Sequence, residues 1–234
     1  MLSVGSYFSG MEAGITALQR IGVPFHLRWS TDSDPHCKRY ILGTHKPTQF
    51  FDDIVERKPD DEVAVDLYLW TPPCTSFSIS GKQRGVAGEG KVIKHSLKYI
   101  QRHKPRVAVM ENVKNLDSKK FKPVLTGMLA ALENMGYKTF KTVLNAKDFK
   151  VPQSRERLFI VSIRDDSIHH DFSWPLPLGA SAISAEVPWQ ACGIKVAQLG
   201  KMLGNSVPAP LIGSVLVEAL YAAGLVHTKP SCRV

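Results

Sequence analysis

A cysteine on a glycine-bearing loop is the first candidate for chemistry in this sequence. Cys74 lies in the segment 71-TPPCTSFSISGKQRGVAGEG-90, where Pro72 and Pro73 fix the backbone before it and four glycines follow. A thiol reacts as the thiolate, and a loop position among cationic groups lowers its pKa. A nucleophile held rigidly ahead of a mobile loop is typical of an enzyme that closes over its substrate. The alternative is a buried, inert thiol, which is the role we expect for the other cysteines: Cys37, Cys192 and Cys232.

A carboxylate and two guanidinium groups are the next candidates. Glu111 follows the apolar run VAVM, and burial there would raise the pKa of its carboxyl, so that it acts as an acid or a hydrogen-bond partner. Arg155 and Arg157 alternate in 153-QSRER-157, so in a strand their side chains share one face. The alternatives are a glutamate that faces water and arginines in structural salt bridges. The functional interpretation is a grip on a base edge or a phosphate.

A glycine turn and two aspartates indicate a cofactor with a nucleoside. The turn 7-YFSGMEAG-14 lies between an expected strand and an expected helix, where small residues let a ligand approach the backbone and the helix N-terminus. Asp32 and Asp53 stand at the ends of the second and third expected strands, where a carboxylate can accept hydrogen bonds from a ribose diol. Tight packing of the glycines and ordinary helix capping by the aspartates are the alternatives.

The elements that must position these residues alternate along the chain. Apolar, β-branched runs predict strands and segments of helical period predict helices, which together indicate an α/β fold with a mostly parallel, twisted sheet. In such a sheet, ligands bind outside the carboxyl ends of the strands. Strands are expected at 2–8, 26–31, 48–54, 66–70, 106–111, 137–145 and 157–164, the last two forming a hairpin-like, antiparallel addition, and helices at 11–22, 35–43, 123–136 and 208–225.

Composition limits the classes of function. The 234 residues suffice for one domain with a sizeable core. A formal net charge of +9 indicates a polyanionic partner. The cysteines lack the spacing of a zinc site or a disulfide framework, so no metal is expected. The sequence has no apolar run of membrane-spanning length and no signal-peptide pattern at its start, so we expect a cytoplasmic protein.

Taken in order, these motifs resemble the DNA cytosine C5 methyltransferase family, which uses S-adenosylmethionine. The resemblance covers most of the chain and implies a Rossmann-like methyltransferase fold with helices on both faces of the sheet. It rests on FSGMEAG, 31-TDSDP-35, 52-DDI-54, PPCTSFS, ENV, VPQSRERLFIV and 204-GNSVPAPL-211. The cofactor-binding residues that it implies are Phe8, Ser9, Gly10, Asp32, Ser33, Asp53, Ile54, Asn205 and Ser206.

The resemblance also implies a mechanism on double-stranded DNA. Cys74 would add to C6 of a flipped-out cytosine, Glu111 would hold N3 and N4, and Arg157, assisted by Arg155, would hold O2. Methyl transfer to C5 and loss of the C5 proton would then expel the thiol. Base flipping costs a few kcal/mol, and residues of the closing loop would hold the opened duplex through phosphate and groove contacts: Ser78, Lys82, Gln83 and Arg84.

The sequence departs from the family in its recognition region. We expect a catalytic part at 1–164, a reduced target-recognition segment at 165–198 and a return to the catalytic part at 199–234, in a monomer whose missing recognition surface a partner subunit could supply. Glu12 and Ala13 stand where many members carry glycines. Methylation of RNA by the same chemistry, and nucleic-acid binding without catalysis, are the alternative functions.

Overall fold

The computed structural model describes residues 1–53, 63–73, 86–178, 198, 202 and 207–230, without the side chains of residues 86–91. Eight residues with expected roles therefore lie outside the described residues, as does most of the expected recognition segment. These eight are Ile54, Cys74, Ser78, Lys82, Gln83, Arg84, Asn205 and Ser206.

A seven-stranded sheet with the order β3-β2-β1-β4-β5-β7-β6 forms the centre of the molecule. The first five strands in this order are parallel, and β7 runs antiparallel between β5 and β6. This confirms the mostly parallel sheet and the antiparallel pair of the last two strands, whereas the position of β7 beside β5 was not predicted. The strands are β1 (Leu2–Tyr7), β2 (Phe25–Thr31), β3 (Gln49–Phe51), β4 (Leu67–Trp70), β5 (Val107–Val113), β6 (Tyr137–Asn145) and β7 (Glu156–Arg164).

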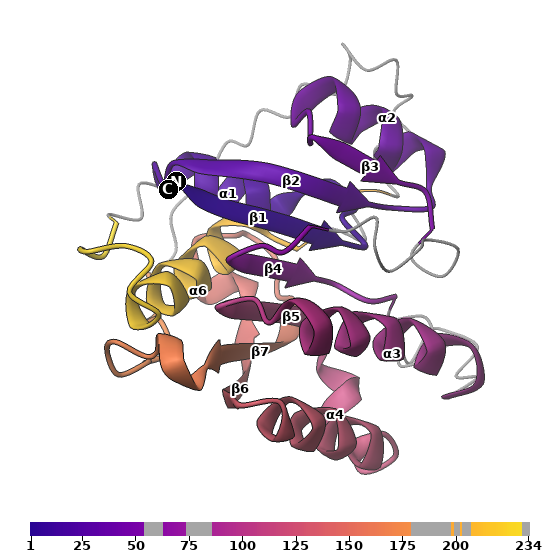
Figure 1. Ribbon diagram of the computed structural model, residues 1–234, viewed down its shortest axis with the longest axis vertical. Coiled ribbons are helices and arrows are strands. Elements are labelled where there is room, and N and C mark those ends of the chain that lie inside the picture. Colours follow the sequence, from indigo (N-terminus) through magenta and orange to yellow (C-terminus); the bar gives the residue numbers. More distant parts are fainter. Residues whose placement is uncertain (54–62, 74–85, 179–197, 199–201, 203–206, 231–234) are drawn as a thin grey trace.

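Helices cover both faces of this sheet, which confirms the expected layer order (Figure 1). One apolar cluster joins the sheet to α1 and α6, and a second joins its other face to α3 and α4. Because β4 is buried on both faces, its sequence is a continuous apolar run. The helices are α1 (Ala13–Arg20), α2 (Pro35–Thr44), α3 (Val86–His103), α4 (Lys122–Asn134) and α6 (Ala209–Ala222).

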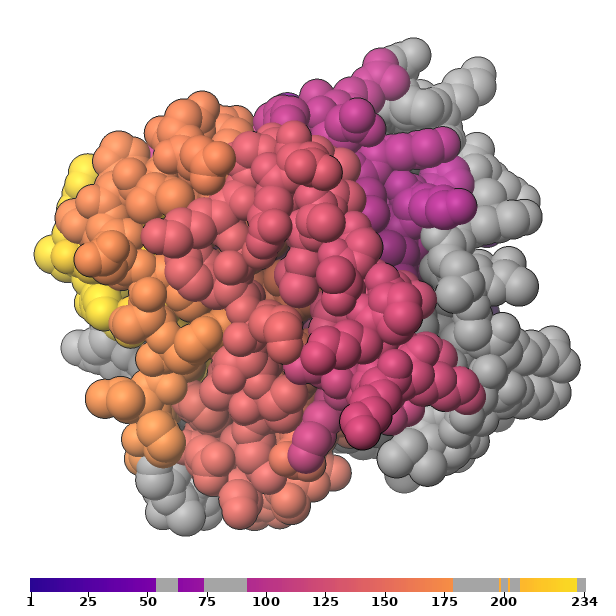
Figure 2. All heavy atoms as spheres, turned by 90° about the horizontal axis from the view of Figure 1, so that it is seen from below, coloured from indigo at the N-terminus to yellow at the C-terminus, as the bar shows by residue number. Residues whose placement is uncertain are grey.

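The segment that follows β7 lies along the sheet edge and α6. The backbone N–H groups of His169 and His170 both donate to the carbonyl of Ala222, the last residue of α6. Phe172 packs on Phe140 of β6 with ring centroids 4.6 Å apart. Figure 2 shows the surface where residues up to 178 adjoin the β6 region. The described start of the expected recognition segment is thus packed against the sheet and α6.

The strand and the helix on either side of the first turn lie near their expected bounds. The strand stops at Tyr7 rather than at residue 8, and α1 begins at Ala13 rather than at residue 11. Between them Phe8 and Glu12 have φ angles of 56° and 52°, in the left-handed region that non-glycine residues rarely adopt. Gly136, the last residue of the helix expected at 123–136, has a φ angle of 84°, the left-handed conformation in which glycine commonly ends a helix.

Two classes of feature are absent from the described part of the chain. Among the helices described, none is both long enough and apolar enough to pass through a membrane. In the same residues, no group of three or more histidine, cysteine, aspartate or glutamate side chains is placed to hold a metal ion.

Candidate active site

The loop after β1 is built from three left-handed residues in alternation. Phe8, Gly10 and Glu12 have φ angles of 56°, 55° and 52°. Ser9 fixes this loop to the neighbouring strands. Its backbone N–H donates to the carbonyl of Thr31, and its Oγ accepts from the N–H of Thr31 at 3.2 Å. The shape of the loop is therefore held by hydrogen bonds to β2 rather than by glycines alone.

A pocket opens beside this loop at the carboxyl ends of β1 and β4. Together with the open solvent at its mouth, the space between its walls amounts to about 410 Å³. Phe8, Ser9 and Gly10, all expected to bind a cofactor, lie on its wall, together with Leu69 of β4 and Ile212 of α6. Apolar side chains, hydroxyl groups and bare backbone thus meet in one concave place, as small-molecule sites require.

The carboxylate of Asp32, which directly follows β2, hydrogen-bonds to the pocket loop. Its Oδ2 accepts the backbone N–H of Gly10 at 2.7 Å, and its Oδ1 accepts that of Asp34 at 2.9 Å. Burial raises the pKa of Asp32, and the two backbone donors partly oppose that rise. Capping of α2 belongs to Asp34, whose Oδ1 accepts from the N–H of His36. Asp32 is therefore not the cap of α2.

Two further residues expected near the cofactor lie on the surface. Ser33 and Asp53 are exposed. β3 ends at Phe51, so Asp53 follows the strand by two residues. Its neighbour Asp52 forms a salt bridge with Lys38 of α2 at 2.7 Å.

The buried Glu111 and the partly buried Arg157 form an ion pair on adjacent strands. The Arg157 Nε lies 2.9 Å from the Glu111 Oε1, and their side chains are 16% and 10% exposed. β5 pairs with β7 so that Val113 faces Arg157, which places Glu111 two residues away on the same face of the sheet. Burial raises the pKa of Glu111 to about 7, against the opposing charges of Arg157 and Arg155. Near neutral pH this carboxyl can therefore either donate or accept a proton.

Asn112 joins the Glu111 strand to the segment that leads into Cys74. Its Nδ2 donates to the carbonyl of Pro72 at 3.1 Å, and the asparagine is almost fully buried. Thr71 ties the same segment to the pocket loop, because its Oγ1 donates to the carbonyl of Phe8 at 2.7 Å. The residues before Cys74 are thus fixed to both the pocket loop and the Glu111 strand.

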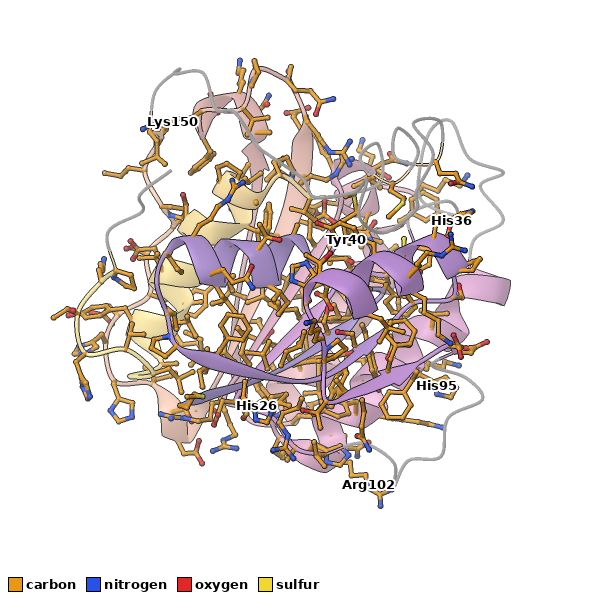
Figure 3. The ribbon with its side chains drawn as sticks, turned by 90° about the horizontal axis from the view of Figure 1, so that it is seen from above. His26, His36, Tyr40, His95, Arg102 and Lys150 are labelled. Carbon is orange, nitrogen blue, oxygen red and sulfur yellow. The ribbon has the colours of Figure 1, made fainter. Side chains whose placement is uncertain are left out.

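Asn145, at the end of β6, organises the connection that carries Arg155. Its Oδ1 accepts the backbone N–H of Arg155 at 2.9 Å and that of Lys147 at 3.2 Å, and its Nδ2 donates to Ser154. Sequence reasoning missed this residue, although an asparagine before Ala-Lys-Asp is a recognisable signal for an Asx-type turn. Figure 3 shows this connection, marked by Lys150, well away from α2, which carries His36 and Tyr40.

Comparisons with known proteins give one consistent family. The family model of C-5 cytosine-specific DNA methylases matches residues 2–186. The type II methyltransferase M.Bsp6I of Bacillus sp. (strain RFL6) is 34% identical over 76% of this chain and 57% of its own length. The orphan methyltransferase M.SPRI of Bacillus phage SPR is 32% identical over 75% of this chain and 40% of its own length.

The solved structures agree in fold. The S. pombe Dnmt2 methyltransferase superposes with a TM-score of 0.67 at 14% identity, covering 94% of this chain and 98% of that chain. The fold is therefore the Rossmann-like methyltransferase fold. The chain spans about half the length of the curated relatives that it matches.

Proposed function

This chain belongs to the family of C-5 cytosine-specific DNA methylases, and from that membership we propose that it transfers a methyl group from S-adenosylmethionine to C5 of cytosine in double-stranded DNA. The observation that carries the proposal is the ion pair between the buried Glu111 and the partly buried Arg157, at 2.9 Å. This pair lies beside the segment that leads into Cys74, to which Asn112 is hydrogen-bonded.

The Glu111–Arg157 pair suits recognition of a cytosine edge. A carboxyl whose pKa is about 7 can donate to the ring nitrogen N3 and accept from the N4 amino group. Arg157 and Arg155 present guanidinium donors for the carbonyl O2, an acceptor. Holding N3 through a proton draws electrons from the ring, which favours attack at C6. The base reaches this site only after leaving the helix stack.

Cys74 is the proposed nucleophile. Its thiolate forms a bond to C6, which makes C5 electron-rich enough to accept the methyl group. Removal of the C5 proton and cleavage of the C6–S bond then restore the aromatic ring and the thiolate. Pro72, held by Asn112 two residues before Cys74, would limit the positions that the sulfur can take. We assign the DNA contacts to four residues of the same sequence segment, 71–90: Ser78, Lys82, Gln83 and Arg84.

The pocket beside the 8–12 loop fits S-adenosylmethionine, which supplies an electrophilic methyl group when bound. Phe8 and Ile212 offer apolar surface, and Ser9 and Gly10 offer backbone to a ligand. Asp32 keeps lone pairs for ribose hydroxyls beside its two backbone bonds. We assign the remaining contacts to residues that lie on the surface or outside the described ranges: Ser33, Asp53, Ile54, Asn205 and Ser206.

The division of the chain is also part of the proposal. Residues 1–164 would form the catalytic part, residues 165–198 a reduced recognition segment, and residues 199–234 a return to the catalytic part, in a cytoplasmic monomer. The packing of α6 on the cluster that contains α1, and the place of Ile212 on the pocket wall, support that return.

Methyl transfer from labelled S-adenosylmethionine tests the proposal. The protein is incubated with matched duplex DNA, single-stranded DNA and tRNA, and Cys74→Ala serves as the control. We expect label at C5 of cytosine in the duplex and none with the variant. Transfer to tRNA but not to DNA would contradict the substrate, and labelled DNA from Cys74→Ala would contradict the nucleophile. Bisulfite sequencing of the product then gives the recognition sequence.

A further inference from the structure

Glu12 is a buried carboxyl that the proposed mechanism does not use. It is 1% exposed, and it stands between the pocket loop and α1 with a left-handed backbone. The Oγ of Ser30 in β2 donates to its Oε1 at 2.5 Å. The hydroxyl groups of Ser6 and Ser9 lie near its side chain and lower the pKa of its carboxyl. Glu12 is therefore held in one place by neutral hydroxyl groups.

The one ionisable residue among the described lining of the pocket is an acid, in an otherwise basic protein. Among the described residues that line the pocket, Glu12 alone carries an ionisable side chain. The chain as a whole has a formal charge of +9. A charge surrounded by low-dielectric walls acts over several ångströms without direct contact. The field inside the pocket thus favours a cation when Glu12 is ionised.

The proposed methyl donor and its product differ in this respect. S-adenosylmethionine has a positively charged sulfonium, whereas S-adenosylhomocysteine has a neutral sulfur and shares every other charged group. We propose that Glu12 is a specificity-determining residue, whose carboxylate makes the pocket prefer the cationic methyl donor over the neutral product. The inference rests on the proposed function, since it concerns the ligand of the same pocket.

The surroundings of Glu12 make this preference depend on pH. Burial raises the pKa of Glu12 to about 7, and the carboxylate of Asp32, the charged neighbour in the turn after β2, raises it further. The hydroxyl groups of Ser6, Ser9 and Ser30 oppose that rise. β4 and α6 contribute apolar Leu69 and Ile212 to the pocket wall beside it. Binding of a cation near Glu12 should therefore release a proton, because the cation stabilises the ionised form.

The preference has a use in turnover. Methyl transfer removes the positive charge from the sulfur, so the attraction of the Glu12 carboxylate for the ligand disappears in the same step. The product then leaves more readily than the substrate. A glutamine at this position would keep the acceptor for Ser30 and lose only the charge, which makes Glu12→Gln the appropriate variant.

Titration calorimetry of the full chain tests the inference without activity. S-adenosylmethionine and S-adenosylhomocysteine are titrated separately at pH 6, 7 and 8, in pairs of buffers with different ionisation enthalpies. For the wild type we expect the ratio of the two dissociation constants to shift by about tenfold toward the methyl donor from pH 6 to pH 8. At pH 7 the methyl donor should release about half a proton more than the product.

Controls separate charge from other effects. Glu12→Gln should remove both the pH dependence and the extra proton release. Asp66→Asn, a matched change at a carboxyl that bonds Ser3 at the other end of the sheet, should keep both. Sinefungin, which carries an ammonium group at the place of the sulfonium, should behave like the methyl donor.

The outcomes distinguish the inference from the proposed function. Binding of both ligands by Glu12→Gln with the wild-type ratio and proton release would overturn the inference alone. If Glu12→Gln does not fold, a wild-type ratio that stays constant from pH 6 to pH 8 overturns it equally. Binding of neither ligand by the wild type would overturn the proposed function, and the inference with it.

Discussion

Glu12 and Glu111 are two buried carboxyls whose pKa values burial raises to about 7, in two regions with different partners. Glu12 is held by the hydroxyl group of Ser30, so its partner stays neutral at every pH. Glu111 is paired with the guanidinium of Arg157. Under the proposed roles, carboxyls with the same pKa serve two tasks: the one among hydroxyl groups supplies a charge to a pocket, and the one beside a cation presents a proton to a base.

Loss of the Glu111 carboxyl should have the largest effect. Glu111→Gln keeps the shape and removes the titratable proton, so we expect the rate of methyl transfer to fall about 10²- to 10⁴-fold, the usual contribution of a positioned acid or base. Binding of S-adenosylmethionine should stay unchanged. Single-turnover kinetics measure the rate, and calorimetry measures binding. Glu12→Gln should instead weaken binding of S-adenosylmethionine and have little effect on the single-turnover rate. Equal losses of binding in both variants would break the distinction between the two regions.

The two carboxyls should also make stability depend on pH in the same direction. Their folded pKa values lie above the unfolded value of 4.5, so the folded state binds more protons between pH 4.5 and about 7. Stability from these groups is therefore lost as the pH rises through that window. We expect the free energy of unfolding of wild type, relative to Glu12→Gln, to fall by about 2 kcal/mol between pH 5 and pH 8.

Urea denaturation at several pH values measures this difference. Wild type must be compared with Glu12→Gln because His45 also makes stability depend on pH. Burial lowers the pKa of His45 to about 4, so its contribution to the free energy of unfolding rises between pH 4 and 6.5, and this contribution cancels in the comparison. A difference that stays constant with pH would show that the pKa of Glu12 is not raised by folding.

The fold could be predicted from the sequence because its signals are local. The alternation of strands and helices, and the antiparallel pair β6 and β7, follow from apolar runs and their periods. The burial of Glu111 was one of two alternatives that its position after the run VAVM left open. The left-handed backbone of Phe8 and Glu12 was not, since that conformation is usually read from glycines.

The supports of the site could not be predicted because they join residues far apart in the chain. The bond between Asn112 and Pro72 spans 40 positions, and that between Ser30 and Glu12 spans 18. Asn145 bonds Arg155 across a ten-residue connection. Each of these residues is an ordinary polar side chain by type. Its role appears only when the sheet brings its partner beside it.

Asn145 offers a test of how the Glu111 region depends on its surroundings. Asn145→Ala removes the acceptor for the N–H of Arg155, so Arg155 should move away from Glu111, whose pKa its charge lowers. We expect methyl transfer to fall about tenfold and the pH profile to shift toward higher pH, since the carboxyl keeps its proton longer. Asn145→Asp keeps an Oδ1 acceptor for both N–H groups, loses only the donor to Ser154, and should lose less activity. A lower rate with an unshifted profile would indicate a role for Asn145 that does not pass through Glu111.

Ser30 gives the smallest and most local test, on the Glu12 side. Ser30→Ala removes the 2.5 Å hydrogen bond to the Glu12 Oε1, a bond that lowers the pKa of that carboxyl. We expect the pKa of Glu12 to rise and the free energy of unfolding to drop by about 1–2 kcal/mol at pH 8, where the carboxylate loses a donor. At pH 5 the drop should be smaller, because Glu12 is protonated and can donate to Ser6 or Ser9 instead. An equal drop at both pH values would mean that Ser30 stabilises the protein by packing alone, and that the hydroxyl groups around Glu12 do not tune its charge.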